Sequence, residues 1–154
     1  MTKLYKIIII SLVLLGIVFV YIIKQNNITS LKLDVTSYDM FVDNSFNLNE
    51  TLSLGYPIMI EVGSEDCVAC KEMMPIMASV AKKLDGKAFI LFVDYSKYPD
   101  VANKFDFELT PTQFFYNKEG KLHKKNVGVL SENNIITIFL EMGVELEWYI
   151  KYIW

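Results

Sequence analysis

The sequence predicts an α/β domain that follows an N-terminal apolar helix. After about residue 45, short apolar runs typical of strands alternate with helix-forming segments. The only two cysteines, Cys67 and Cys70, form a C-x-x-C pair between one such run and a helix. An uncharged apolar stretch over residues 7–23 stands apart from this alternation. A chain of 154 residues therefore has room for one ordinary domain and an appendage.

The appendage has the properties of a membrane anchor. Residues 7–23 carry no charge and have lysines on both sides. At about 1.5 Å per residue, such a helix is roughly 25 Å long, which is at the short end for crossing a membrane. A cleaved signal peptide is the alternative, but residues 24–29 have no Ala-x-Ala pattern. We therefore expect an uncleaved single-pass anchor in the cell membrane. Because positive charge is in slight excess before the anchor, we expect residues 1–6 to be cytoplasmic and the domain extracytoplasmic.

Three further segments follow the anchor. We expect a polar tether over residues 24–45, a compact domain over residues 46–143 and an aromatic C-terminal extension over residues 144–154. The aromatic residues of the extension are Trp148, Tyr149, Tyr152 and Trp154. Packing of the extension onto the domain is the default expectation, and contact with the membrane surface is the alternative.

The first half of the domain has clear start and stop signals. A short helix over residues 48–54 would end at Gly55. The apolar run over residues 57–62 predicts a strand. A long helix would run from the cysteines to Leu84 and end before Gly86.

The second half begins with a continuous apolar run over residues 88–94, which is typical of a strand buried on both faces. A short helix over residues 99–105 follows. Strands over residues 112–116 and 121–127 would form a hairpin, because the segment between them contains Asn and Gly. The last helix would begin after Ser131, a good N-cap residue, and it carries apolar residues at helical spacing.

Composition excludes some partners. All 15 basic residues are lysine, and residues 25–154 carry 12 lysines against 18 acidic residues, a formal balance of −6. The chain has no arginine and no Gly-rich phosphate loop. Phosphate recognition favours arginine forks and basic stripes. We therefore expect no nucleic-acid partner.

The C-x-x-C pair predicts thiol–disulfide exchange. Two intervening residues place the thiols at i and i+3 on the first turn of a helix, where they can close a disulfide without large backbone movement. Cys67 would lie at the helix N-terminus, where unpaired amides and the helix dipole stabilise a thiolate. A thiolate is the species that attacks disulfides.

Two other uses of the pair are possible. A structural zinc site needs four ligands, so this chain would have to recruit carboxylates around its single histidine, His123. A static disulfide across so short a loop would remove little entropy from the unfolded chain. We expect no metal and no cofactor.

Residues 48–143 resemble the thioredoxin superfamily. The order of elements matches, with the reactive pair at the start of the first long helix. Further features at family spacing are a kinking proline (Pro75), a cis-proline loop (Thr110-Pro111-Thr112), a buried acid (Glu61), the hairpin turn (Asn117 to Gly120) and the turn into the last helix (Val127 to Ser131). The resemblance implies a thioredoxin fold, which is a central mixed sheet flanked by helices, and a thiol–disulfide oxidoreductase with a redox-active disulfide.

The resemblance also implies roles for individual residues. Cys67 would attack a substrate disulfide, and the more buried Cys70 would then attack Cys67 and release the reduced product. A buried Glu61, with its pKa raised by desolvation, would accept the proton of Cys70 near neutral pH. A cis Pro111 would bring the backbone of Thr110 beside the sulfurs, where it can pair with an extended substrate segment.

The string from Cys67 to Lys71 is similar to the active site of the C-terminal domain of DsbD, and the layout is similar to anchored reductases that work with CcdA-type carriers. This similarity implies a reductase of protein disulfides that takes electrons from a DsbD-like or CcdA-like membrane thiol carrier. An oxidase or isomerase of protein thiols and disulfides is the alternative. A non-catalytic binding module that presents the Pro111 loop is the second alternative.

Two departures from the family bear on the redox chemistry. Asp66 replaces the usual tryptophan before the first cysteine, and Glu65 precedes it. Two carboxylates beside Cys67 should raise its pKa relative to a thioredoxin and favour a more reducing couple. Phe92 replaces the lysine that often accompanies the buried acid, so Glu61 would be more strongly perturbed or would point elsewhere.

Overall fold

The computed structural model describes residues 9, 11–20, 40–84 and 86–146. Contacts divide the chain into two units, residues 1–34 and 35–154. In the first unit, residues 11–20 are helical and expose their apolar side chains. Among the described helices, none combines the length and apolar character needed to cross a membrane. The cytoplasmic segment, both ends of the expected anchor, most of the tether and the aromatic residues after residue 146 lie outside the described residues.

The domain is built on a mixed four-stranded sheet with the order β2-β1-β3-β4. The strands are β1 (Ile58–Gly63), β2 (Phe89–Asp94), β3 (Thr112–Tyr116) and β4 (Leu122–Val127). β1 runs parallel to β2, and β3 runs antiparallel to both β1 and β4. The expected central mixed sheet is confirmed, and the strand bounds agree with the predicted runs to within one residue.

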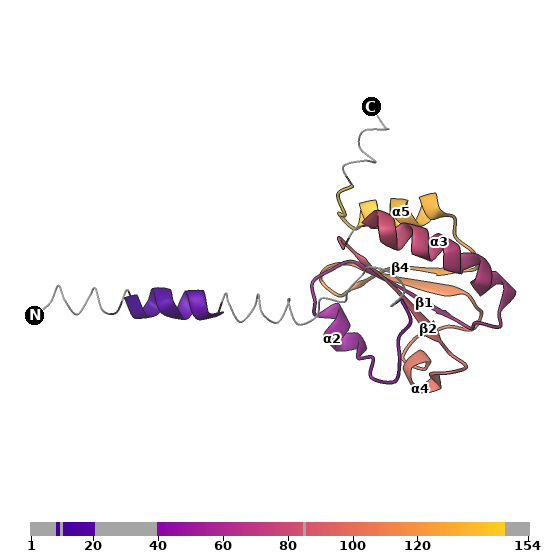
Figure 1. Ribbon diagram of the computed structural model, residues 1–154, viewed down its shortest axis with the longest axis horizontal. Helices are drawn as coiled ribbons and strands as arrows, with labels where there is room; N and C mark the ends of the chain where they lie inside the picture. The colour runs from indigo at the N-terminus through magenta and orange to yellow at the C-terminus, as the bar shows by residue number, and fades with distance from the viewer. Residues whose placement is uncertain (1–8, 10, 21–39, 85, 147–154) are drawn as a thin grey trace, which may run out of the picture. The chain divides into compact units, whose positions relative to one another are not determined.

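Helices cover both faces of this sheet. α3 (Val68–Leu84) and α5 (Glu132–Glu141) lie side by side on one face, and α2 (Leu48–Leu52) and α4 (Pro99–Ala102) lie on the other (Figure 1). The hydroxyl of Ser131 accepts a hydrogen bond from the amide of Asn134 at 3.3 Å, so Ser131 caps α5 as predicted. Pro75 lies inside α3.

The core has two clusters, one on each side of the sheet. The cluster under α3 and α5 includes Met59, Met73, Phe92, Phe115 and Phe139, and the other includes Ile58, Ile60, Val62, Val93 and Phe114. Full burial of each such side chain contributes about 1.5–3 kcal/mol. Because side chains alternate along a strand, residues 59, 61 and 63 of β1 face α3. This alternation places Glu61 on the same side of the sheet as the cysteines.

The domain begins earlier than the predicted boundary at residue 46. The amide of Phe92 donates to the carbonyl of Met40 at 2.6 Å, and the amide of Val42 donates to the carbonyl of Phe92 at 3.0 Å. These bonds pair residues 40–42 with the outer edge of β2. An open edge leaves amides and carbonyls without partners, and a short apolar segment satisfies them here. The end of the expected tether therefore belongs to the sheet.

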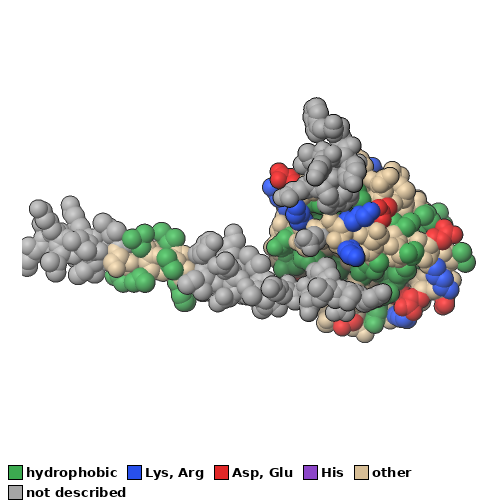
Figure 2. All heavy atoms as spheres, turned by 45° about the horizontal axis from the view of Figure 1, so that its top comes forward, with side chains coloured by type: hydrophobic (Ala, Val, Ile, Leu, Met, Phe, Trp, Pro, Cys, Tyr) green, Lys and Arg blue, Asp and Glu red, His purple; other side chains and the backbone are tan. Residues whose placement is uncertain are grey.

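The start of the expected C-terminal extension also belongs to the core. Val144 and Leu146 are buried in the cluster under α3 and α5. Lys87 donates a hydrogen bond from its ammonium group to the carbonyl of Glu145 at 2.9 Å. On the face of the domain shown in Figure 2, lysine and acidic side chains are interspersed with apolar side chains.

Candidate active site

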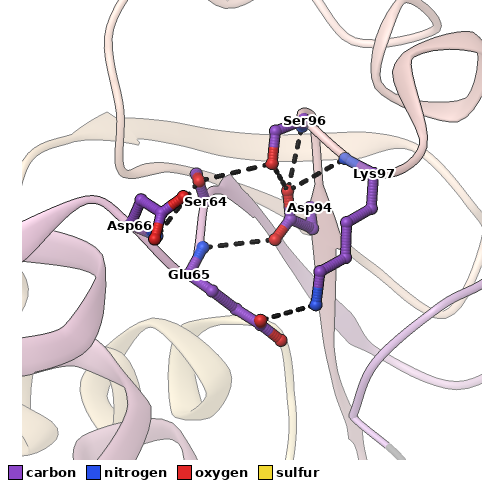
Figure 3. Close-up of polar contacts among 6 residues, drawn as sticks. All are labelled: Ser64, Glu65, Asp66, Asp94, Ser96 and Lys97. Atoms are coloured by element: carbon purple, nitrogen blue, oxygen red, sulfur yellow. Dashed lines mark hydrogen bonds and ion pairs between the residues drawn. The ribbon is translucent and has the colours of Figure 1, made fainter.

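The segment between β1 and α3 is tied to the end of β2 by Asp94. The buried carboxylate of Asp94 accepts a hydrogen bond from the amide of Glu65 at 3.2 Å. It also accepts from the hydroxyl and amide of Ser96, at 2.5 and 2.9 Å, and from the amide of Lys97 at 3.2 Å (Figure 3). Burial raises the pKa of Asp94, but the hydrogen bonds from these partners outweigh it and lower the pKa. Asp94 therefore holds this segment as a carboxylate.

The same segment turns tightly into α3. Ser64 accepts two hydrogen bonds there, one on its hydroxyl from the amide of Asp66 at 3.2 Å and one on its carbonyl from the amide of Cys67 at 3.1 Å. Glu65 pairs with Lys97, with 2.5 Å between the carboxylate and the ammonium group (Figure 3). The turn leaves Cys67 immediately before the first residue of α3.

Cys67 is partly exposed, and its sulfur has hydrogen-bond donors around it. The amide of Cys70 lies 3.4 Å from Cys67 Sγ, and the hydroxyl of Thr110 lies 3.7 Å from it. The hydrogen bond from the Cys70 thiol is the main cause that lowers the pKa of Cys67. Burial opposes this effect, while the amide of Cys70 and the hydroxyl of Thr110 add to it. The geometry therefore favours a thiolate at the predicted position.

Cys70 is fully buried and has the opposite character. Burial raises its pKa to about 12, and the interactions with Cys67 and the charge of Glu61 contribute. Gly63 makes room for this thiol, because a Cβ atom at that position would lie 2.9 Å from both Cys70 Sγ and the ring of Phe92. Cys67 is thus an accessible thiol with a lowered pKa, and Cys70 is a buried thiol with a raised pKa.

Glu61 is fully buried beside this pair. Burial raises its pKa to about 8, against a hydrogen bond from Gln113 that lowers it, and the charge of Cys67 raises it further. Gln113 Nε2 donates to Glu61 Oε2 at 2.9 Å, while Oε1 has no hydrogen-bond partner among the described residues. Phe92 lies opposite Glu61 on β2. Of the two outcomes expected from Phe92, the geometry agrees with a perturbed acid, because Glu61 is buried beside the cysteine pair and does not point elsewhere.

The predicted cis-proline loop closes the site. The bond between Thr110 and Pro111 is cis. The carbonyl of Thr110 lies 3.9 Å from Cys67 Sγ, and Pro111 is buried behind it. The apolar side chains of Val68 and Leu109, next to Cys67 and Thr110 in the chain, are 74% and 67% exposed. The structure thus brings all five predicted site residues, Glu61, Cys67, Cys70, Thr110 and Pro111, to one end of the sheet.

In the described part of the chain, no group of three or more His, Cys, Asp or Glu side chains could hold a metal ion. His123 lies on β4 with its Nε2 3.6 Å from the carboxylate of Glu141. The residues that sequence reasoning missed are Asp94, Gln113 and Asn126. The glutamine inside the apolar run 112–116 was the available signal for a buried polar contact.

The thioredoxin family model matches residues 39–141. The chain belongs to the thioredoxin family. It is 32% identical over 80 residues to chloroplastic thioredoxin Y from Oryza sativa subsp. japonica, which covers 52% of this chain and 47% of that protein. It is 27% identical over 94 residues to thioredoxin from Rickettsia bellii, covering 61% and 88%. The chain thus spans about half the length of the plant thioredoxin Y relatives it matches.

A solved structure supports the same fold. A mutant thioredoxin from Halobacterium salinarum superposes with a TM-score of 0.60 at 17% identity, covering 69% of this chain and 90% of that one. At this identity the likeness concerns the thioredoxin fold alone.

Proposed function

We propose that this thioredoxin-family chain is a thiol–disulfide oxidoreductase that reduces protein disulfides. The observation that carries the proposal is the asymmetric pair of thiols: the pKa of the accessible Cys67 is lowered, and that of the buried Cys70 is raised to about 12. The similarity to proteins named thioredoxin supports this activity. Such an asymmetry gives one thiol for attack and one for release.

The reaction would proceed in two exchanges. The thiolate of Cys67 attacks one sulfur of a substrate disulfide, and the other substrate sulfur leaves as a thiolate and takes up a proton. Cys70 then transfers its proton to Glu61 and attacks the Cys67 sulfur of the mixed disulfide. An intramolecular disulfide forms and the second substrate sulfur leaves as a thiolate. Two electrons pass from the cysteine pair to the substrate.

The second exchange becomes easier once Cys67 is in the mixed disulfide. The hydrogen bond and charge of Cys67 are among the causes that raise the pKa of Cys70. A neutral sulfur at Cys67 removes these two causes, so burial and the charge of Glu61 are the main obstacles that remain. Glu61, with a pKa of about 8, is a suitable proton acceptor near neutral pH.

The substrate would bind as an added strand. The Thr110 backbone lies beside Cys67 and can pair with an extended segment, and the exposed Val68 and Leu109 offer apolar contacts to its side chains. Electrons would reach the pair from a membrane thiol carrier of the CcdA or DsbD type. This part of the proposal rests on the similarity of the Cys67–Lys71 string.

Two serine variants test the catalytic proposal. Cys70→Ser should accumulate mixed disulfides with protein substrates, whereas Cys67→Ser should neither react nor accumulate them. Binding of a substrate peptide that survives in Cys67→Ser, with no turnover by the unmodified protein, would instead indicate a binding module. The reduction potential sets the direction: about −250 mV or below supports a reductase, and about −120 to −180 mV supports an oxidase or isomerase.

We also propose that the chain is held in the cell membrane by residues 7–23, with the domain on the extracytoplasmic side. The uncharged run and the exposed apolar side chains of helix 11–20 support this proposal. A membrane-impermeant maleimide added to intact cells should label Cys67, the accessible thiol. A variant with both cysteines replaced by serine is the control. Labelling that appears only after lysis would place the domain inside the cell.

A further inference from the structure

A row of polar side chains crosses three strands beneath the cysteine pair. Glu61 on β1 lies opposite Gln113 on β3, and Gln113 lies opposite Asn126 on β4. Gln113 Nε2 donates to Glu61 Oε2 at 2.9 Å, and Asn126 Nδ2 donates to Gln113 Oε1 at 2.8 Å. Glu61 and Gln113 are fully buried, and Asn126 is half-buried. The row is therefore a continuous hydrogen-bonded chain in the interior.

A backbone carbonyl fixes the donor-to-acceptor direction of the hydrogen bonds along this row. Asn126 Nδ2 also donates to the carbonyl of Gly128 at 3.2 Å. A carbonyl can only accept, so the amide nitrogen of Asn126 must face it and must present its second proton to Gln113. Gln113 in turn must accept with its oxygen and donate with its nitrogen to Glu61. Reversing either amide would place two acceptors against each other.

We propose that Gln113 and Asn126 are positioning residues for the proton transfer from Cys70. Asn126 fixes the orientation of the Gln113 amide, and Gln113 holds Glu61 Oε2, so that Oε1 is left to accept the proton. This inference rests on the proposed function, because it assumes that Glu61 accepts the proton of Cys70. The unpartnered, buried Oε1 supports it. A buried oxygen without a partner is unfavourable, and such exceptions occur at catalytic groups.

Among the described residues, the other groups around Glu61 do not stabilise its carboxylate. The titratable groups that interact with its charge are Cys67 and Cys70, both from the start of the neighbouring α3. β2 presents Phe92, which neither donates nor accepts. Gln113 is thus the donor that stabilises the carboxylate among the described residues. Removing this donor should disfavour the carboxylate and raise the pKa of Glu61.

The test follows the titration of Glu61 by carbon-13 NMR of its carboxyl group in the reduced full chain, held in a non-ionic detergent. Glu61→Gln assigns the signal. Gln113→Leu should move the Glu61 midpoint to higher pH by about one to two units, because hydrogen bonds to charged groups contribute about 1.5–3 kcal/mol. An unchanged midpoint would overturn the role of Gln113.

Asn126→Leu tests the second residue without adding a charge. It should also raise the midpoint, by less than Gln113→Leu, and it should have no further effect when Gln113 is already leucine. An equal effect in both backgrounds would mean that Asn126 does not act through Gln113 and would overturn its role. Asn133→Leu makes the same change at an exposed position of α5 and should leave the midpoint unchanged.

Kinetics separate this inference from the proposed function. With one equivalent of the aromatic disulfide DTNB, the first release of thiolate reports attack by Cys67 and the second reports attack by Cys70. Gln113→Leu should shift the pH profile of the second phase in parallel with the Glu61 midpoint. If Glu61→Gln does not slow the second phase, Glu61 is not the proton acceptor. If it does slow that phase but Gln113→Leu shifts nothing, only the positioning role fails.

Discussion

The buried acid should make the stability of the domain depend on pH in a direction opposite to that of an ordinary carboxylate. Glu61 has a folded-state pKa of about 8, against 4.5 for an ordinary glutamate, mainly because of burial. Below pH 4.5 the acid is protonated in both the folded and unfolded states and has no effect on their difference. Between pH 4.5 and about 8 it is ionised in the unfolded chain alone, so rising pH favours unfolding.

The magnitude follows from the width of this window. Each pH unit within it lowers the free energy of unfolding by about 1.4 kcal/mol, which amounts to about 5 kcal/mol over the window. Glu61→Gln removes the titration and keeps an oxygen that can accept the hydrogen bond of Gln113. We therefore expect the variant to match the unmodified protein near pH 4 and to exceed it in stability by about 5 kcal/mol at pH 8.

Urea unfolding of the reduced full chain, followed by circular dichroism at several pH values between 4 and 8, measures this difference. At each pH, the difference between the unfolding free energies of the two proteins cancels the contributions of all other titrating groups that the variant leaves unaltered. Glu132→Gln is a suitable control. Its partly exposed carboxylate pairs with Lys83, and its pKa is lowered, chiefly by the Lys83 hydrogen bond. Relative to the unmodified protein, this control should be less stable above pH 4.5, where the Glu132 carboxylate would otherwise contribute. A Glu61→Gln advantage that does not grow between pH 5 and 8 would refute the reasoning.

Three further substitutions report on the site. Gly63→Ala should destabilise the domain by about 1–3 kcal/mol in urea unfolding, because its Cβ would lie 2.9 Å from both Cys70 Sγ and the Phe92 ring. Asp94→Ala should lower the free energy of unfolding by about 2–4 kcal/mol in the same assay, because four hydrogen-bond donors lose a buried carboxylate. A loss below about 1 kcal/mol would argue against the role of Asp94 in holding the segment between β1 and α3. The rate of alkylation of Cys67 by iodoacetamide should have its pH midpoint below 9.0, the ordinary pKa of a thiol. Cys70→Ala removes the thiol donor that is the main cause of the lowered pKa and should raise this midpoint; an unmoved midpoint would contradict that cause.

The sequence was sufficient for those parts of the fold that depend on neighbours in the chain. The apolar run over residues 88–94 and the cap at Ser131 are local signals, and the structure confirms both elements. The placement of Pro111 beside Cys67 is what the resemblance to the thioredoxin superfamily implies, and the structure brings the two together through the contact of Thr110 with Cys67 Sγ. The local pattern therefore predicted the elements, and the family resemblance supplied the expectation that these residues meet at one end of the sheet.

The contacts that tune the site depend on strand register, which the sequence pattern leaves open. Gln113 could be read as a polar residue in an apolar strand, but its partners are set by the pairing of β3 with both β1 and β4. Residues 40–42 were assigned to the tether because a three-residue strand has no periodicity to detect, and their pairing with Phe92 requires a formed β2 edge. In each case a distant partner, rather than the local sequence, decides the structure.

Three acidic groups at this end of the sheet have pKa values displaced in different directions, and the displacements suit successive steps of one exchange. Hydrogen bonds lower the pKa of Cys67, which favours the thiolate of the thiol proposed to attack. Burial raises the pKa of Cys70 to about 12 with a contribution from Cys67, and in the proposed exchange that contribution ends when Cys67 becomes neutral in a mixed disulfide. In the proposed exchange Glu61, whose pKa burial raises to about 8, would accept the proton that Cys70 must lose before it attacks. Environments that separate the pKa values of neighbouring groups assign their roles. The stability that the buried Glu61 removes near neutral pH is therefore a direct consequence of the same burial that makes it a usable proton acceptor.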